Sequence, residues 1–340
     1  MRIIFDSILL VIDNHFHWKG KNKMKKNKWF SFLPLLVMMS VLFLAACSQE
    51  TKEEADKESD ENTASDTRTY ASEEGDIEIP ANPERVAVMA ATYPGNFLEL
   101  GVTPIAITDW SANSKFLGDQ LKDAEVVAPD DYETLLELAP DLIVTYTGDE
   151  NMAKYKEIAP TIGLTYEKYG YIEQHLEIGK ILGKEEEAQA WVDEWNAKAE
   201  EAKKKVQEAI GTEATATVVE TFGKDTYVYG QNWGRGTEVI YQALGMKAPE
   251  KVEGEAFGPG YKAISAEAIP EYAGDYIFVG EGANVSSSTF METGLWKNIP
   301  AVQAGNVITF DSDSFYFNDP ISIEKELEFI VDALIEKAAK

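Results

Sequence analysis

Short apolar runs and helical patterns alternate through the first part of the chain. Strands are expected at residues 77–79, 85–89, 104–107 and 141–145, and helices at 96–100 and 132–138. Strands that alternate with helices are typical of an α/β lobe. We therefore expect a first α/β lobe over residues 73–183.

A much longer helical pattern follows at residues 184–210. Glutamates fill its first turn, lysines lie near its end, and Gly211 follows where a C-terminal cap belongs. At 1.5 Å per residue the segment would be about 40 Å long. Such a helix can connect two lobes, and an ordinary surface helix is the alternative. We assign residues 184–211 to an interlobe helix.

The alternation of strands and helices starts again after Gly211. Strands are expected at residues 215–221, 226–229, 275–279 and 307–310, and helices at 237–244, 265–272 and 324–339. We therefore expect a second α/β lobe over residues 212–340. The predicted fold class is α/β, with two Rossmann-like lobes joined by one long helix.

A sequence echo supports two equivalent lobes. Residues 133–144 and 267–278 each contain a short helical pattern, a turn, an aspartate and an apolar strand. Glu133 and Glu267 hold equivalent places, eight residues before that aspartate. In so acidic a chain, the residues alone favour plain solvation of both glutamates.

The segment up to Cys47 has a pattern of its own. Lysines at residues 25–28 precede a mostly apolar run at 29–43, which ends in Leu-Ala-Ala-Cys47. This order is that of a secretory signal peptide, and we assign residues 24–46 to it. An ordinary membrane anchor is the alternative, but the run is short for a span, which needs about 20 residues. The ending resembles a bacterial lipobox, which implies that Cys47 is lipidated and begins the mature protein.

Two flanking segments fit neither the signal peptide nor the lobes. Residues 1–23 precede a complete signal that begins at Met24, so we expect them to come from an over-extended reading frame. Residues 47–72 are rich in charged and hydroxyl side chains and have almost no large apolar ones. Because such a segment cannot bury a core, we expect a flexible acidic tether there.

The charge of the chain argues against nucleic acid as a partner. The chain has 31 basic and 59 acidic residues, and residues 1–46 hold seven and two of these. The part from Cys47 onward therefore has 24 basic and 57 acidic residues, a formal charge near −33. Nucleic-acid binding needs a basic footprint, which this chain lacks.

Histidine and nucleophile patterns argue against a metal site and against an enzyme. His175 is the one histidine after Cys47, and we expect a solvated residue on a surface helix. Direct capture of transition metals usually needs histidine beside carboxylates. The chain also lacks a nucleophile elbow and a phosphate-binding loop. We expect a binding protein without a cofactor or a metal site of its own.

Aromatic side chains gather where predicted strands end. They are Tyr93, Tyr146, Tyr166, Tyr227 and Tyr316, with Trp233 and Arg235 in the glycine-rich segment 230–236. Ligands of open α/β sheets bind beyond the carboxyl ends of the strands. Aromatic rings with one arginine suit a bulky ligand that has an apolar body and anionic oxygen. For any single tyrosine, an ordinary packing role is the alternative.

Six segments carry a family resemblance through their order and spacing. They are Asn82–Val86, Glu137–Ile143, Lys156–Thr161, Asn232–Gly236, Leu295–Asn298 and Phe315–Pro320. From about Tyr70 to its end, the chain resembles the ABC-transporter substrate-binding lipoproteins for iron(III)–hydroxamate siderophores of Gram-positive bacteria. The resemblance implies a class III periplasmic-binding-protein fold with a rigid interlobe helix and limited hinge closure. It also implies a monomer, lipid-anchored at the extracytoplasmic face of the cell membrane.

The resemblance further implies roles for single residues. Trp233 and Arg235 would meet the iron–hydroxamate centre, with the arginine donating to its oxygens. Tyr93, Tyr146, Tyr166, Tyr227 and Tyr316 are the expected lining of the same cleft. Glu133 and Glu267 would dock onto arginines of the permease. The siderophore itself would hold the iron.

The charge of the pocket narrows the expected ligand. A ferric catecholate is multiply negative and generally needs several basic residues, whereas the expected pocket offers one arginine. This favours a neutral or weakly charged hydroxamate, unless Lys115 and Lys224 reach the cleft. Another bulky chelate, such as a ferric catecholate, ferric citrate, haem or cobalamin, is the alternative.

Overall fold

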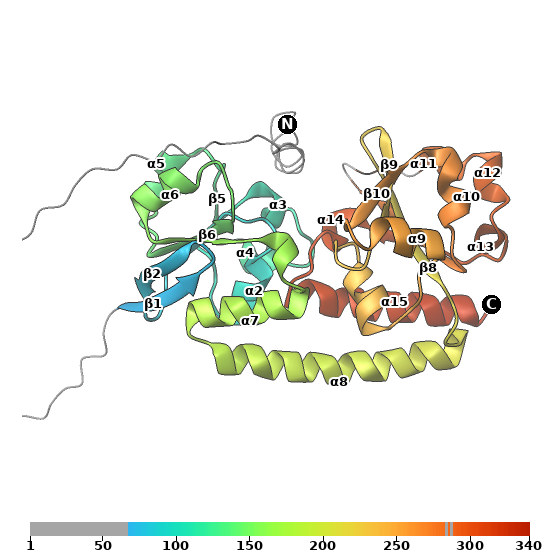
Figure 1. The fold of residues 1–340 in the computed structure, drawn as a ribbon, viewed down its shortest axis with the longest axis horizontal. Helices are drawn as coiled ribbons and strands as arrows, with labels where there is room; N and C mark the ends of the chain where they lie inside the picture. The colour runs from blue at the N-terminus through green and yellow to red at the C-terminus, as the bar shows by residue number, and fades with distance from the viewer. Residues whose placement is uncertain (1–66, 283–284, 286–287) are drawn as a thin grey trace, which may run out of the picture. The chain divides into compact units, whose positions relative to one another are not determined.

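The computed structural model describes residues 67–282, residue 285 and residues 288–340 (Figure 1). The expected extension at 1–23, the signal peptide at 24–46 and Cys47 lie outside the described residues, as does most of the expected tether. Within the described ranges, no helix combines the length and the apolar character that a membrane span requires.

The described residues form one hairpin and two five-stranded sheets. The hairpin consists of β1 (Thr67–Ser72) and β2 (Gly75–Pro80). The first sheet contains β3 (Val86–Val88), β4 (Ala106–Ile107), β5 (Glu125–Val126), β6 (Leu142–Tyr146) and β7 (Thr161–Leu164). The second sheet contains β8 (Ala216–Phe222), β9 (Asp225–Tyr229), β10 (Tyr261–Ile264), β11 (Tyr276–Glu281) and β12 (Val307–Asp311).

Helices accompany both sheets and join them. Those of the first lobe are α2 (Pro94–Glu99), α3 (Asp109–Ala112), α4 (Gly118–Leu121), α5 (Tyr132–Glu137), α6 (Met152–Ile158), the 3₁₀ turn η2 (Tyr166–Lys168) and α7 (Tyr171–Leu182). The long helix α8 (Glu185–Ile210) leads to the second lobe. There follow the π-helix η3 (Glu238–Ala243), α9 (Glu250–Ala256), the 3₁₀ turn η4 (Ala266–Ala268), α10 (Ile269–Tyr272), α11 (Ser288–Met291), α12 (Gly294–Lys297), α13 (Pro300–Gln303), α14 (Ser312–Phe315) and α15 (Pro320–Ala338).

The two sheets share one strand order, which confirms the predicted fold class of two α/β lobes. The first is ordered β5-β4-β3-β6-β7 with all neighbours parallel, and the second β10-β9-β8-β11-β12 with β9 antiparallel to both its neighbours. Strand β3 shows why these runs are almost wholly apolar. Val86 and Val88 pack on one face of the sheet and Ala87 on the other, because helices cover both faces.

The sequence echo corresponds to a structural one. Asp141 accepts hydrogen bonds from the backbone N–H groups of Glu84 and Arg85, at 2.8 and 3.1 Å. Asp275 accepts from the N–H and the hydroxyl of Thr215, at 2.9 and 2.8 Å. Each aspartate thereby ties the start of one central strand to the start of its neighbour.

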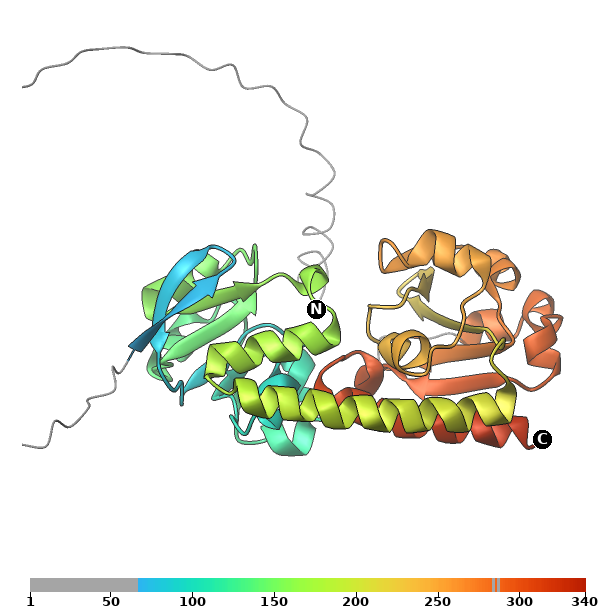
Figure 2. The ribbon, with the colours of Figure 1, turned by 60° about the horizontal axis from the view of Figure 1, so that its bottom comes forward.

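Helix α8 confirms the predicted long helix and packs along two others. Figures 1 and 2 both show it beside α7 and α15. Its residues Trp191 and Trp195 are stacked, with ring centroids 5.8 Å apart. The Trp195 indole donates to the hydroxyl of Tyr171 in α7 at 2.8 Å, and the Trp191 indole donates to Glu324 in α15 at 3.1 Å. The helix is thus bound to elements of both lobes.

The expected tether at residues 47–72 requires a correction at its end. Thr67–Ser72 form β1, which pairs antiparallel with β2. Tyr70 of this strand packs into the core of the first lobe, where it is 6% exposed. The strand escapes prediction because its one buried side chain gives no apolar run.

The prediction of a solvated His175 is wrong. The side chain is fully buried on α7, with its ring against Trp191 and its Nδ1 atom 3.2 Å from Oδ1 of Asn96. Helix α7 packs against both α2 and α8, so polar residues of its inner face are buried with the apolar ones.

The buried histidine predicts a pH dependence of stability. Burial lowers the pKa of His175 to about 4, whereas an unfolded histidine has a pKa of about 6.5. Between these values the unfolded chain binds more protons, so the free energy of unfolding falls as the pH decreases from about 6.5 to about 4. At about 1.4 kcal/mol per pKa unit, this contribution is on the order of 3 kcal/mol.

Substitution His175→Gln should remove that contribution, because glutamine can still bond to Asn96 but does not titrate. Urea unfolding at pH 7, 5.5 and 4.5 measures the pH dependence of both proteins. We expect a steeper loss of stability on acidification in the wild type. Identical pH profiles would contradict this assignment.

Candidate ligand-binding site

A pocket lies at the carboxyl ends of strands β8 and β12, where open α/β sheets place their ligands. Both lobes contribute to it. Trp110 comes from the first lobe, and Glu220, Phe222, Arg235, Val285, Ser312, Asp313 and Tyr316 come from the second. The pocket therefore lies between the lobes and contains two of the predicted site residues, Arg235 and Tyr316.

A tight turn presents Arg235 to this pocket. Gly234, Arg235 and Gly236 all have positive φ angles, of 67°, 60° and 76°. A Cβ atom at Gly234 would lie 2.4 Å from the backbone oxygen of Tyr316, so only glycine fits there. The N–H of Arg235 donates to the carbonyl of Phe315 at 2.5 Å. The glycine-rich motif thus lets the turn pack directly onto the segment that carries Tyr316.

The Arg235 side chain is held on four sides. Its Nε donates to Glu220 at 3.1 Å and its Nη1 to the carbonyl of Trp233 at 2.9 Å. The guanidinium lies between the rings of Tyr229 and Tyr316, at 4.7 and 4.6 Å from their centroids. These bonds use Nε and Nη1, so Nη2 can donate to an anionic oxygen of a ligand.

Glu220 is the buried counter-charge of Arg235. Its side chain is 1% exposed, and that of Arg235 is 12% exposed. The same carboxylate accepts from the hydroxyls of Ser312 at 2.6 Å and Tyr229 at 3.0 Å. A charge-assisted network of this kind fixes the arginine and balances its charge within the pocket.

Aromatic rings from the two lobes meet beside Arg235. The rings of Tyr166 and Trp233 are 5.9 Å apart, and those of Trp110 and Tyr316 are 4.7 Å apart. Tyr146 contacts Tyr166 at 6.3 Å. The structure therefore brings together five of the residues predicted from the sequence: Trp233, Arg235, Tyr146, Tyr166 and Tyr316.

The other two predicted tyrosines lie at the edge of this cluster. Tyr227 is linked to this cluster through Tyr261, whose ring contacts both Tyr227 at 5.8 Å and Trp233 at 5.0 Å, and through Tyr229, whose ring lies 6.4 Å from that of Tyr227. Tyr93 requires a correction in part: it is 1% exposed in the core of the first lobe, and its ring lies 5.3 Å from that of Tyr146, behind the cluster. Its hydroxyl donates to the carbonyl of Leu164 at 3.3 Å, so it supports the strand β7 that precedes Tyr166.

Several pocket residues were missed by the sequence reasoning. Trp110 follows strand β4, so the rule about strand ends that selected the tyrosines also applies to it. Glu220 is an acidic residue within the β-branched run of β8, and a carboxylate in a buried strand usually has a charged partner. The sequence alone does not identify Tyr316 as the partner of Trp110 or Arg235 as the partner of Glu220.

The two lysines considered as sources of positive charge are differently placed. The ammonium group of Lys115 in the first lobe pairs at 2.5 Å with Asp311 of the second lobe, which directly precedes the pocket residues Ser312 and Asp313. Lys224 is exposed in the turn between β8 and β9. The positive charges of Arg235 and Lys115 are thus both matched by carboxylates.

The two glutamates expected to face a permease are both exposed. Glu133 lies in the first turn of α5 and Glu267 in η4. Each precedes the aspartate that ties the central strands of its lobe, Asp141 or Asp275. They therefore occupy corresponding surface positions on the two lobes.

Comparison with known proteins agrees with this architecture. A family model described as periplasmic binding protein matches residues 86–314. The iron(3+)-hydroxamate-binding protein FhuD of Bacillus subtilis is 36% identical over 310 residues, 89% of this chain and 96% of that protein. The iron(3+)-hydroxamate-binding protein YxeB of the same organism is 37% identical over 326 residues, which are 93% of this chain and 98% of that protein. The structure of FhuD2 from Staphylococcus aureus with bound ferrioxamine B matches with a TM-score of 0.71 and 34% identity, over 75% of this chain and 100% of that one.

The buried pair predicts that Glu220→Gln destabilises the protein. The substitution keeps the shape of the side chain but leaves the Arg235 guanidinium without its counter-charge. Removal of one partner from a buried pair typically costs about 3–5 kcal/mol. Urea unfolding at neutral pH should show a decrease of this order.

Glu213→Gln is the matched control for that measurement. Glu213 pairs with Lys247 on the surface, where the two side chains are 80% and 51% exposed. An exposed pair contributes at most about 1 kcal/mol. Equal effects of the two substitutions would show that burial of the Glu220–Arg235 pair has no special importance for stability.

Proposed function

Because the chain belongs to the periplasmic binding protein family, we propose that it captures ferric hydroxamate siderophores outside the cytoplasm and delivers them to an ABC permease. The observation that carries the proposal is the fixed Arg235 in a pocket between the lobes, with the ring of Tyr316 against its guanidinium. The rings of Tyr166 and Trp233 meet across the lobes nearby. The hydroxamate-binding relatives support the same ligand class.

The pocket suits the surface of such a complex. The hydroxamate oxygens coordinate the iron and remain partly negative on their outer side, so they can accept hydrogen bonds from the Arg235 guanidinium. The carbon chains of the siderophore can pack against the faces of Trp233, Tyr166, Tyr146 and Tyr316. The iron remains bound to the siderophore throughout and is cargo.

The charge of the pocket favours neutral or weakly charged complexes. Glu220 balances Arg235, and Asp311 balances Lys115, so a multiply negative ferric catecholate would find little unbalanced positive charge. Ferric catecholates, ferric citrate, haem and cobalamin are therefore less favoured ligands of the same site. Arg235 can still donate hydrogen bonds to a ligand, while Glu220 balances its positive charge.

A bulky ligand must separate rings that touch across the lobes. Tyr166 and Trp233 form one such contact, and Trp110 and Tyr316 form the other. We infer that ligand entry parts these two pairs by a limited hinge movement. We expect the hinge to lie at the ends of helix α8, because this helix connects the two lobes.

The proposal extends to the membrane and to the permease. Cys47 would carry the lipid anchor, and the sequence between Cys47 and β1 would separate the anchor from the lobes. A single copy of the chain would present Glu133 and Glu267 to arginines of the permease, because both side chains are exposed at corresponding places.

A titration panel tests the ligand class. Intrinsic tryptophan fluorescence of the purified protein is followed during addition of ferrioxamine B, ferrichrome, a ferric triscatecholate and ferric citrate. We expect saturable quenching by the two hydroxamates at the lowest concentrations, because Trp233 and Trp110 lie in the site. Binding of the catecholate alone would contradict the proposal.

In the same titration, Arg235→Ala should weaken hydroxamate binding by about 1–3 kcal/mol, the range for a hydrogen bond from a charged group. Arg235→Lys keeps the positive charge but loses the planar array of N–H donors. Its affinity for the hydroxamate should therefore lie between those of the wild type and Arg235→Ala. Thermal unfolding establishes that both variants are folded. An unchanged Kd in the folded Arg235→Ala variant would remove Arg235 from the site.

The docking role predicts a separation of binding from uptake. The double substitution Glu133→Ala and Glu267→Ala should leave the Kd for ferrioxamine B unchanged and impair siderophore-dependent iron uptake by cells. Glu137→Ala with Glu271→Ala is the matched control, because these exposed glutamates lie four residues further along each segment. Equal uptake by both double variants would contradict the docking role.

A further inference from the structure

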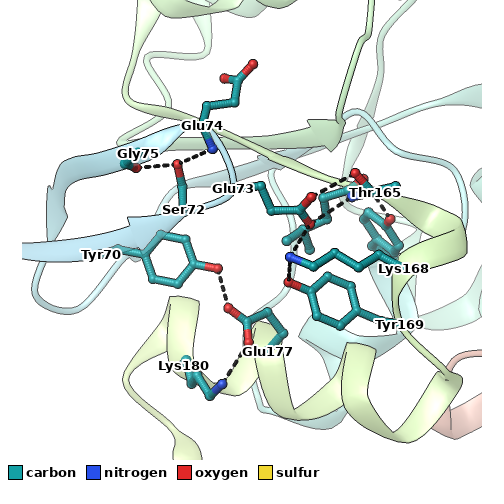
Figure 3. A network of polar contacts seen from close by, with 12 residues as sticks. Tyr70, Ser72, Glu73, Glu74, Gly75, Thr165, Lys168, Tyr169, Glu177 and Lys180 are labelled. Atoms are coloured by element: carbon teal, nitrogen blue, oxygen red, sulfur yellow. Dashed lines mark hydrogen bonds and ion pairs between the residues drawn. The ribbon is translucent and has the colours of Figure 1, made fainter.

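The hairpin turn between β1 and β2 reaches a segment of the ligand site. Glu73 in this turn accepts two hydrogen bonds from Thr165, one from its backbone N–H at 3.1 Å and one from its hydroxyl at 2.8 Å (Figure 3). Thr165 directly precedes Tyr166, whose ring contacts Trp233. One carboxylate therefore holds both donors of the residue next to Tyr166.

The surroundings keep Glu73 ionised and ordered. Its side chain is only 14% exposed although it lies in a hairpin turn, and Nζ of Lys168 is 3.5 Å away. Burial alone would raise the pKa of Glu73, but the hydrogen bonds from Thr165 and the charge of Lys168 lower it below its ordinary value. At neutral pH the carboxylate is thus available to accept both bonds.

The same segment is held from the inside of the lobe by Tyr93. The carbonyl of Leu164, which precedes Thr165, accepts from the Tyr93 hydroxyl at 3.3 Å and from the N–H of Thr147 at 3.0 Å. The hydroxyl of Thr165 does not cap the η2 turn that begins at Tyr166; it donates to Glu73. The segment before the turn is therefore held from two sides, by Tyr93 and Thr147 within the lobe and by Glu73 of the hairpin.

The hairpin is itself well anchored. Nη2 of Arg68 donates to the carbonyls of Lys180 and Ile181 at the end of α7, at 2.6 and 2.7 Å. The hydroxyl of Tyr70 donates to Glu177 on the same helix at 2.6 Å, as Figure 3 also shows. A support fixed to α7 can hold the Tyr166 segment at a constant place relative to the lobe.

From this geometry we propose that Glu73 is a positioning residue of the ligand site. It touches no ligand; it fixes Thr165 so that Tyr166 keeps its orientation toward Tyr146 and Trp233. The hairpin then contributes to the ligand site, although its first strand, β1, lies within the segment that the sequence assigned to the tether. The inference rests on the proposed function, because it requires that Tyr166 contact the siderophore.

A double-mutant cycle on Glu73 and Tyr166 tests the proposal, with ferrioxamine B as ligand and tryptophan fluorescence as readout. Glu73→Ala alone should weaken binding about 3- to 10-fold, the scale of one net hydrogen bond. Tyr166→Ala alone should weaken it at least as much. In the Tyr166→Ala background, Glu73→Ala should have no further effect on the Kd, because the residue that it positions is gone.

Two more variants separate positioning from a general loss of structure. Glu74→Gln changes the neighbouring residue of the same turn, which pairs with Lys156 at 2.5 Å on the surface, and should leave the Kd within about 2-fold. Thr165→Val removes the hydroxyl donor from the other side of the contact and should weaken binding, as Glu73→Ala does. Thermal unfolding of each variant confirms that it is folded.

The possible outcomes are distinct. An unchanged Kd in Glu73→Ala overturns the positioning role, and so does a Glu73→Ala effect that persists in full in the Tyr166→Ala background. An equal effect of Glu74→Gln also overturns it. Failure of the proposed function is recognised separately, since the wild-type protein itself would then bind neither ferrioxamine B nor ferrichrome.

Discussion

The arrangement of the two lobes depends on the close packing of α2, α8 and α15 at one junction. A Cβ atom at Gly95 of α2 would lie 1.9 Å from a carboxylate oxygen of Asp319, so only glycine allows the first lobe to meet the start of α15. On the other side of α15, the indole of Trp191 in α8 donates a hydrogen bond to Glu324 of α15. Because α15 is fastened from two directions, this packing restricts the lobes to small movements such as the limited hinge movement proposed for ligand entry.

Acidic side chains in the interior lie in two different environments. In the pocket, the side chain of Glu220 pairs with Arg235 at 3.1 Å. Around the junction, burial raises the pKa values of Glu238, Asp319 and Glu326, and that of Asp319 reaches about 6. The pocket thus holds a balanced ion pair, whereas burial at the junction disfavours the charged form of these three carboxyl groups.

The sequence predicted those features that depend on local pattern. The two lobes and helix α8 follow from periodicity, and the echo around Asp141 and Asp275 follows from matching residue types. The glycines of segment 230–236 pointed to Trp233 and Arg235 as candidate site residues. The missed features depend on contacts between distant segments. Glu73 and Thr165 are 92 residues apart, and His175 is buried by Asn96 and Trp191, which no pattern around it reveals. Tyr93 was assigned to the cleft because it follows a strand, but the helix that begins after it turns its ring into the core.

The two ends of the β1–β2 hairpin have a mechanical consequence. Thr67 pairs with Pro80, so the strand end nearest the proposed membrane anchor lies beside the point where the chain enters the first lobe. A pull on Thr67 would load the pairs of the hairpin one after another, beginning at its base. That base is reinforced by Arg68, which is bonded to the end of α7, whereas Glu73 lies at the far tip. Tension from the anchor would therefore act first on the bonds at the base of the hairpin and only later on Glu73 and the ring of Tyr166. The ligand site would keep its shape under moderate tension.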